Sequence, residues 1–174
     1  MSNNRGVLAA LGAVFLWAAS HAASGQTFTK LRHAPPQPVG LGFLLTDGTV
    51  MFQASNFKDW YRLTPDKAGS YRNGVWSQLA SLTGGYAPNA FASAVLADGR
   101  LVITGGEFNG NGTYVFSNRG AVYDPVKNLW TNLKPPAGWA YIGDSPCAVL
   151  PNGKFLVGRK FDTRMAVLDP ATLT

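Results

Sequence analysis

The sequence predicts an all-β fold made of repeated four-stranded antiparallel sheets. Three markers recur in one order: a hairpin turn between two apolar runs, a segment that ends in proline, and an outer segment with Trp and Leu. Their period is about 50 residues, which is the spacing of β-propeller blades. Gly (20 residues), Pro (11) and only 14% charged residues are typical of such a turn-rich chain.

The hairpin turns are the first marker. They are Asp47-Gly48, Asp98-Gly99 and Asn152-Gly153, and the glycines lie 51 and then 54 residues apart. Asp-Gly and Asn-Gly favour type I′ turns, in which both central residues take a positive φ. The sequence therefore predicts a type I′ hairpin between the first two strands of each blade.

The other two markers place the third and outer strands. Thr64-Pro65, Asp124-Pro125 and Asp169-Pro170 end the third strands, where the Asp side chain is expected to cap backbone N–H groups. Trp76 and Trp130 lie 54 residues apart and mark the outer strands. We expect these tryptophans to fill the space between blades.

The markers divide residues 26–174 into one isolated strand and three blades. We expect an outer strand at 27–32, complete blades at 41–80 and 91–134, and a partial blade at 145–174. The Phe-Thr-Lys-Leu segment at 28–31 repeats the pattern Trp-Thr-Asn-Leu of the outer strand, so it is expected to complete the last blade of a closed ring.

The third blade is expected to lack its outer strand. Asp124 precedes Trp130 by six residues, so Asp169 requires an aromatic directly after Thr174. The sequence therefore predicts an incomplete ring of about two complete blades and a partial third. Exposed apolar blade faces would then favour self-association.

Residues 1–25 have the order of a secretory signal peptide. Arg5 precedes an apolar run at 7–19, which is expected to be helical, and small residues follow it. The run has about 13 residues, whereas a membrane-spanning helix takes about 20, so an uncleaved anchor is the less favoured alternative. We expect cleavage within 22–25, a periplasmic or secreted product, and no membrane contact afterwards.

The charge pattern argues against a nucleic-acid partner. The chain has 15 basic and 9 acidic residues, but no basic run is longer than Arg159-Lys160. Nucleic-acid binding proteins usually carry a clustered basic stripe. The single cysteine, Cys147, excludes an internal disulfide.

The middle unit resembles a Kelch repeat. It has an apolar strand that ends in Gly105-Gly106, then a loop, then Tyr123-Asp124-Pro125, and then Trp130. More closely, residues 28–174 resemble the Kelch-type propeller of galactose oxidase-like proteins at the level of blades. The glycine pair is expected to let one strand turn tightly beside its neighbour.

The resemblance is weaker in the outer two blades. Gln53-Ala54-Ser55 and Gly158-Arg159-Lys160 stand where the family has its glycine pair. The resemblance also implies an alternative function, the N-terminal part of a copper radical oxidase, whose cysteine is cross-linked to a copper-binding tyrosine. Cys147 begins an innermost strand, as the family's cysteine does. The same chemistry needs two histidines, and His33 is the only one outside the signal segment. We therefore expect no catalytic residues, no metal and no cofactor.

Function is expected in loops that emerge on one face of the blades, namely the connections between second and third strands and those between blades. Aromatic side chains beside Asn, Asp and Arg suit sugars, because apolar ring faces stack while polar groups bind hydroxyls. We therefore predict a non-catalytic binding scaffold for a protein, carbohydrate or cell-envelope partner. The main candidates are Tyr86, Asn89, Glu107, Asn109, Trp139, Tyr141, Asp144 and Arg159, with Asn56, Asn111, Tyr114 and Asp162 beside them.

Two alternatives stay open for this face. In the first, the loops bind no ligand and are simply solvated, and Trp139 and Tyr141 pack beneath their neighbours. In the second, Glu107 and Asp144 form a carboxylate pair of the kind that hydrolyses glycosides, which depends on their separation.

Overall fold

The computed structural model describes residues 27–110 and 112–174. In these residues the chain forms four antiparallel sheets and one short 3-10 helix, η1 (Tyr71–Asn73). The predicted signal helix in residues 1–25 lies outside the described residues. No helix in the described part of the chain is long and apolar enough to span a membrane.

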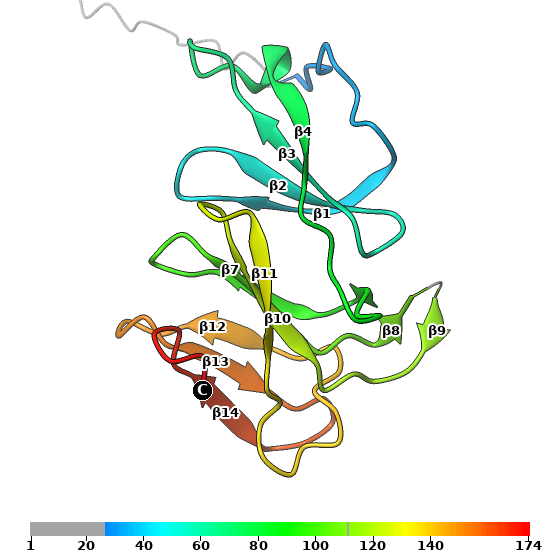
Figure 1. The fold of residues 1–174 in the computed structure, drawn as a ribbon, viewed down its shortest axis with the longest axis vertical. Coiled ribbons are helices and arrows are strands. Elements are labelled where there is room, and N and C mark those ends of the chain that lie inside the picture. Colours follow the sequence, from blue (N-terminus) through cyan, green and yellow to red (C-terminus); the bar gives the residue numbers. More distant parts are fainter. Residues whose placement is uncertain (1–26, 111) are drawn as a thin grey trace, which may run out of the picture.

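Three of the sheets are blades, stacked along the long axis of the molecule (Figure 1). Blade one contains β1 (Val39–Leu44), β2 (Val50–Ala54), β3 (Trp60–Thr64) and β4 (Val75–Leu79). Blade two contains β6 (Ala92–Val95), β7 (Leu101–Thr104), β10 (Gly120–Asp124) and β11 (Leu129–Leu133). Blade three contains β12 (Cys147–Val149), β13 (Phe155–Gly158) and β14 (Met165–Leu168). The prediction of an all-β chain with two four-stranded sheets and a smaller third is confirmed.

A small fourth sheet lies beside blade two. It pairs β5 (Pro88–Asn89), β8 (Phe108–Asn109) and β9 (Thr113–Tyr114) in the order β5-β8-β9. The β8–β9 hairpin is an insertion between the second and third strands of blade two, and it projects from one side of the molecule (Figure 1). It therefore enlarges the face on which the loops were expected.

Residues 27–32 form no strand within the described part of the chain, and the outer strand expected there stays a prediction. An isolated strand needs a partner for its backbone groups, and the expected partner belongs to a blade outside these three. Only the end of the segment is held, because the Arg32 N–H donates to the Arg72 carbonyl at 2.9 Å. Pairing of this segment with a last blade stays a prediction.

The three hairpins form at the predicted places, but the type I′ assignment is wrong. Only the glycine of each pair takes a positive φ, which is 79° at Gly48. The Gly48 N–H donates to the Leu45 carbonyl at 3.0 Å, so the loop has three residues and ends in a glycine bulge. The physical reason is a side-chain bond: Asp47 Oδ1 accepts the Thr49 N–H at 2.9 Å. Asp98 and Asn152 make the same bond.

Aromatic rings fill the space between blades one and two, which we call the first joint. The Trp130 ring on β11 lies 5.2 Å from Trp60 on β3 and 5.1 Å from Tyr123 on β10, between ring centroids. Its Nε1 donates to the Ala80 carbonyl at 2.9 Å. All three rings are buried in one cluster that contains residues of both blades. A tryptophan from the outer strand of blade two thus covers blade one.

One asparagine adds a polar link to the first joint. Asn128 Oδ1 accepts the Ala80 N–H at 2.8 Å and the Tyr123 hydroxyl at 2.8 Å. The neighbouring Asp124 Oδ1 accepts the N–H groups of Val126 and Lys127, so the turn between β10 and β11 is capped as the Asp-Pro marker suggested. The polar groups of Asp124 and Asn128 in this turn are therefore hydrogen-bonded, and the turn places Trp130 in the joint.

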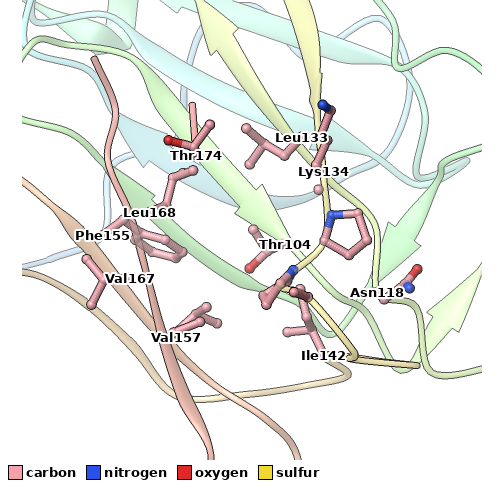
Figure 2. Close-up of a pocket in the computed structure, with 15 residues that line it drawn as sticks. Thr104, Asn118, Leu133, Lys134, Ile142, Phe155, Val157, Val167, Leu168 and Thr174 are labelled. Carbon is pink, nitrogen blue, oxygen red and sulfur yellow. The ribbon is translucent and has the colours of Figure 1, made fainter. Parts of the chain in front are cut away.

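The space between blades two and three, the second joint, is only partly filled. Phe155, Val157 and Ile142 are buried in one cluster with residues of blade two. Toward the outer strands, a cavity of about 260 Å³ lies between β11 and β14. Figure 2 shows Leu133 and Lys134 on one side of this cavity and Phe155, Val167 and Leu168 on the other. Most of its lining is carbon, contributed by both blades and by the connection between them.

Candidate binding site

Three connections of blades two and three come together on the loop face. The Gly106 N–H, after β7, donates to the Gly143 carbonyl in the connection between the blades at 3.0 Å. The Lys160 N–H, after β13, donates to the Ile142 carbonyl at 2.9 Å. These backbone bonds fix the loop after β7, the connection before β12 and the loop after β13 as one surface.

The glycine pair makes this close approach possible. Gly105 and Gly106 take φ values of 78° and 115°, a region that side chains with a Cβ rarely adopt. A Cβ on Gly105 would overlap the backbone carbonyl of Gly143, and one on Gly106 would lie 2.9 Å from Pro88 Cβ. The pair therefore holds the connections at backbone contact, in addition to making the expected tight turn.

A row of aromatic rings crosses this surface. Successive ring centroids lie 5.5 Å, 5.3 Å and 5.4 Å apart, and a branch from the third ring to a fifth spans 6.0 Å. The first two rings lie on β8 and β9, and the others come from the three connections just described. We call this set the aromatic strip; its members in order are Phe108, Tyr114, Phe116 and Tyr141, with Phe161 as the branch.

The strip is open to solvent at two places. Tyr114 is 62% exposed and Phe161 is 81% exposed. Phe161 also takes a φ of 57°, a left-handed conformation that is strained for a bulky side chain, and Phe57 takes a φ of 64° in the corresponding loop of blade one. These two rings give the strip an apolar surface that is accessible to a ligand.

Charged groups line one end of the strip. The Arg159 guanidinium lies over the Tyr141 ring, with its central carbon 4.1 Å from the ring centroid, and its Nη1 donates to Asp162 at 3.1 Å. Lys160 Nζ donates to Asp144 Oδ2 at 3.1 Å. The contact with Tyr141 and the bond to Asp162 together hold the guanidinium beside the rings.

Asp162, the second carboxylate at this end, has a lowered pKa. Arg164 donates two bonds to Asp162 Oδ2, at 2.9 Å and 2.6 Å. Together with the N–H of Arg164, these bonds lower the pKa of Asp162 from 3.8 to about 2. The carboxylate is therefore charged at neutral pH, and it positions both Arg159 and Arg164.

Of the eight main candidates, the structure gathers Tyr141, Asp144 and Arg159 in this cluster. Asp162 and Tyr114, which were named beside them, lie in the same surface. Tyr141 is half-buried, so it is neither fully packed beneath its neighbours nor fully exposed.

Tyr86 and Trp139 were expected on the open face, and the structure corrects both placements. Tyr86 is 1% exposed, and its hydroxyl donates to the Gly105 and Arg119 carbonyls. Trp139 is 8% exposed and packs in the second joint. Desolvation raises the pKa of the Tyr86 phenol, so it stays protonated. Both are core residues. For Trp139 this agrees with the alternative in which it packs beneath its neighbours.

The remaining candidates serve the β5-β8-β9 sheet or lie elsewhere. The Asn109 side chain accepts the Ala87 N–H at 3.0 Å and donates to the Gly85 carbonyl at 3.0 Å, so it is used within the fold. The Asn89 carbonyl accepts the Glu107 N–H at 3.1 Å. Asn56 binds Asp59 in blade one, at 2.6 Å. Asn111 lies outside the described residues.

Three rings of the aromatic strip were missed by reasoning from sequence. They are Phe108, Phe116 and Phe161, and each lies in a connection that had already been singled out. The alternation of Tyr114 and Phe116 is the signal that was available, because residues two apart on an extended segment point to the same side. Phe161 had no such neighbour in sequence.

Cys147 lies in the second joint and not in the aromatic strip. Its thiol donates to the Ser93 carbonyl of blade two at 3.3 Å, and burial raises the thiol pKa. Within residues 27–110 and 112–174, no three His, Cys, Asp or Glu side chains are grouped closely enough to hold a metal ion.

Comparison with known proteins agrees with this architecture. The family model described as the Kelch motif matches residues 88–137, which hold blade two, the glycine pair and Trp130. The chain forms blades of a Kelch-type β-propeller. No curated protein sequence matches it.

Two solved propellers resemble these Kelch blades. The structure of YjhT aligns with a TM-score of 0.52 and 26% sequence identity, over 71% of this chain and 34% of YjhT. Selenomethionine-substituted virginiamycin B lyase from Staphylococcus aureus aligns with a TM-score of 0.51 and 14% identity, over 78% of this chain and 40% of the lyase. The chain thus spans about a third to two fifths of these proteins. The likeness to the lyase concerns the fold alone.

Proposed function

We propose that these Kelch blades are a non-catalytic scaffold that binds polysaccharide through the aromatic strip. The observation that supports this most is the row of rings from three connections, with Tyr114 and Phe161 largely exposed. Sugars offer apolar C–H faces that stack on aromatic rings and hydroxyls that bind charged and amide groups. A row of rings suits an extended chain of sugars better than a single one.

The charged end of the strip supports the same ligand class. The central carbon of the Arg159 guanidinium lies 4.1 Å from the Tyr141 ring centroid and the guanidinium is held by Asp162, so it is ordered before a ligand arrives. Ordered donors cost little conformational entropy on binding. Asp144, half of whose side chain is exposed, adds an acceptor for hydroxyls beside Lys160.

The proposal includes export, so that the partner is a polysaccharide of the cell envelope. It rests on the signal-like order of residues 5–25, with a basic residue, an apolar run and small residues. Cell fractionation and N-terminal sequencing test this part. The exported chain is expected to begin within residues 23–26, and a product that keeps Met1 in the cytoplasm contradicts export.

Binding is tested with three defined probes: cellohexaose, chitohexaose and soluble peptidoglycan fragments. Calorimetric titration is expected to show binding of at least one probe. Tyr114→Ala and Phe161→Ala should each weaken it by about tenfold, since one stacking contact contributes about 1–1.5 kcal/mol.

Val126→Ala is the matched control, because Val126 is 93% exposed but lies in the turn between β10 and β11, outside the strip. It should leave the affinity unchanged. Absence of binding to all three probes, or equal losses in the strip variants and the control, would contradict the proposal.

A further inference from the structure

A hollow of about 390 Å³ opens on the loop face of blade one, and we call it the blade-one hollow. Its walls come from β1, from the end of β2 with the loop that follows, and from β5, which leads into blade two. The start of β1 and the loop between β2 and β3 lie on the same side of the molecule as β8 and β9 (Figure 1). The hollow is therefore part of the face that carries the aromatic strip.

The hollow lies where blade one departs from the glycine pair. In blade two, Gly105-Gly106 brings the connection into the next blade to backbone contact. Gln53-Ala54-Ser55 stands in this place in blade one, and here a side chain makes the link, because Gln53 Nε2 donates to the Pro88 carbonyl at 2.9 Å. A glutamine side chain keeps the two backbones apart, and the hollow lies beside it.

A bulge in β1 borders the hollow. The pairing of β1 with β2 shifts its register between Val39 and Gly42. Bulges of this kind are frequent beside binding sites, where they redirect side chains. A Cβ added to Gly40 would meet no atom of the described residues within 4 Å, so the space over this residue is open. Leu41 and Phe57 are apolar parts of the lining.

Gln53 presents a fixed hydrogen-bond acceptor to the hollow. The residue is 2% exposed, and its Nε2 also donates to the Phe57 carbonyl at 2.8 Å, so both of its N–H groups are used. No group of the described residues donates to Gln53 Oε1, which still reaches solvent. A buried amide oxygen normally has a donor. Here a ligand N–H can supply it.

Asn89 adds a donor and connects the hollow with the aromatic strip. Its Oδ1 accepts the Ala90 N–H at 2.9 Å, which leaves the Nδ2 group without a partner among the described residues. Asn89 also pairs with Phe108 across β5 and β8, and Phe108 is the first ring of the strip. The hollow thus adjoins the end of the strip that lies away from its charged groups.

We propose that the blade-one hollow binds the N-acetyl group of a hexosamine in an extended sugar chain, an inference that rests on the proposed function of the aromatic strip. The lining contains no charged side chain, which suits a neutral group. An acetamido group offers an N–H to Gln53 Oε1, a carbonyl to Asn89 Nδ2 and a methyl group to the apolar walls. A hydroxyl at the same place of the sugar lacks the carbonyl and the methyl group. The hollow therefore selects chains that contain N-acetylhexosamine.

A matched pair of sugars tests the selection. Chitohexaose and cellohexaose have the same backbone and differ in the acetamido group at C2. Calorimetric titration should show that chitohexaose binds more tightly by about tenfold, from one added hydrogen bond and one buried methyl group. The ratio of the two affinities is the quantity to compare among variants.

Two variants alter the hollow with little risk to the fold. Gly40→Leu fills it and should reduce the ratio to about one. Asn89→Asp keeps the oxygen that accepts the Ala90 N–H but loses the free donor, so the ratio should fall by about fivefold. Leu44→Phe is the control, because Leu44 is 63% exposed at the other end of β1. It should leave both affinities unchanged.

The outcomes separate this inference from the proposed function. Equal affinities for the two hexaoses overturn the inference and leave polysaccharide binding by the strip intact. No binding of either sugar or of peptidoglycan fragments overturns both. A preference for chitohexaose that Gly40→Leu leaves unchanged also overturns the inference. The same holds if the sugar-free stem peptide of peptidoglycan binds and chitohexaose does not, because the occupant of the hollow is then a peptide.

Discussion

The two joints between blades are formed by corresponding residues but are filled differently. Trp130 lies in the first joint, against Trp60, and its Nε1 binds the carbonyl of Ala80. Gly120 and Lys134 take the places of Trp60 and Ala80 in the second joint, and they border a cavity of about 260 Å³. In the first joint, the outer strand of blade two therefore supplies the ring that seals the contact with blade one.

The second joint depends more on contacts at its loop-face end, away from the outer strands. Gly105 and Gly106 bring the backbone against Gly143, and the Lys160 N–H binds the Ile142 carbonyl. The first joint thus has a buried ring near the outer strands that the second joint lacks, and in the second joint backbone contacts near the loop face add to the apolar cluster. The following changes test this division.

The largest effect is expected from Trp130→Ala. It removes a ring that is 7% exposed and turns the first joint into a copy of the second, with a cavity. Losses for Trp→Ala in a core are about 3–5 kcal/mol. The free energy of unfolding in urea is the measurement.

Trp76→Ala is the matched control for this change. Trp76 has the corresponding place on β4, but it is only half-buried and contacts Phe52 of its own blade. Its loss should be roughly half as large or less. Equal losses for the two variants would mean that Trp130 does not seal a joint.

A smaller loss is expected from Gly105→Ala. The new Cβ overlaps the Gly143 carbonyl, and the φ of 78° becomes strained. Overpacking and left-handed strain each cost about 1–3 kcal/mol. The same unfolding measurement applies, together with amide exchange at Gly106, which should become faster as its bond to Gly143 weakens.

Gly110→Ala is the control that separates the two effects of Gly105→Ala, namely backbone strain and overlap with a neighbouring atom. Gly110 has a φ of 58°, but a Cβ added there would meet no atom of the described residues within 4 Å. Its loss should be about 1–2 kcal/mol, from the backbone alone. If Gly105→Ala costs no more than Gly110→Ala, backbone contact does not hold the second joint.

The smallest effect is expected for the pH dependence of stability, through the bond between Ser81, in the connection after β4, and Asp59, just before β3. The Ser81 hydroxyl donates to Asp59 Oδ1 at 2.5 Å, and this bond is the main cause that lowers the Asp59 pKa below 3.8. Because the folded pKa is lower than the unfolded one, the unfolded state binds more protons. The stabilisation is complete above about pH 5 and is lost as pH falls through the folded pKa.

Asp59→Asn should therefore flatten the dependence of stability on pH between about pH 5 and pH 3. Urea unfolding at several pH values measures it. An unchanged slope in the variant would show that Asp59 contributes no pH-dependent stability.

The blade architecture was accessible from sequence because its markers are local. Asp124 caps the turn after its own strand, and Trp130 follows at a fixed distance. The turn class was not accessible, since it depends on a bond from the Asp47 side chain to the Thr49 N–H. Patterns of residue type do not reveal such a choice between closely related geometries.

The site was predicted only in part because contacts between distant segments create it. Tyr141 and Arg159 were named, but their stacking appears only when the connections after β11 and β13 meet. Tyr86 was placed wrongly for a related reason. Its hydroxyl finds the carbonyls of Gly105 and Arg119, and a tyrosine with satisfied polar groups can be buried completely.

The position of Trp130 also has a consequence for the order of events during synthesis. Blade one is complete in sequence at Leu79, but its Trp60 face is covered by residues made later, the last of which is Trp130, 51 residues after Leu79. A nascent chain that stops between these points carries an uncovered apolar face on a finished sheet. Segments of this kind are where growing chains recruit chaperones or aggregate. Slow translation between codons 80 and 130 would therefore lower the yield of folded protein more than slow translation after codon 130.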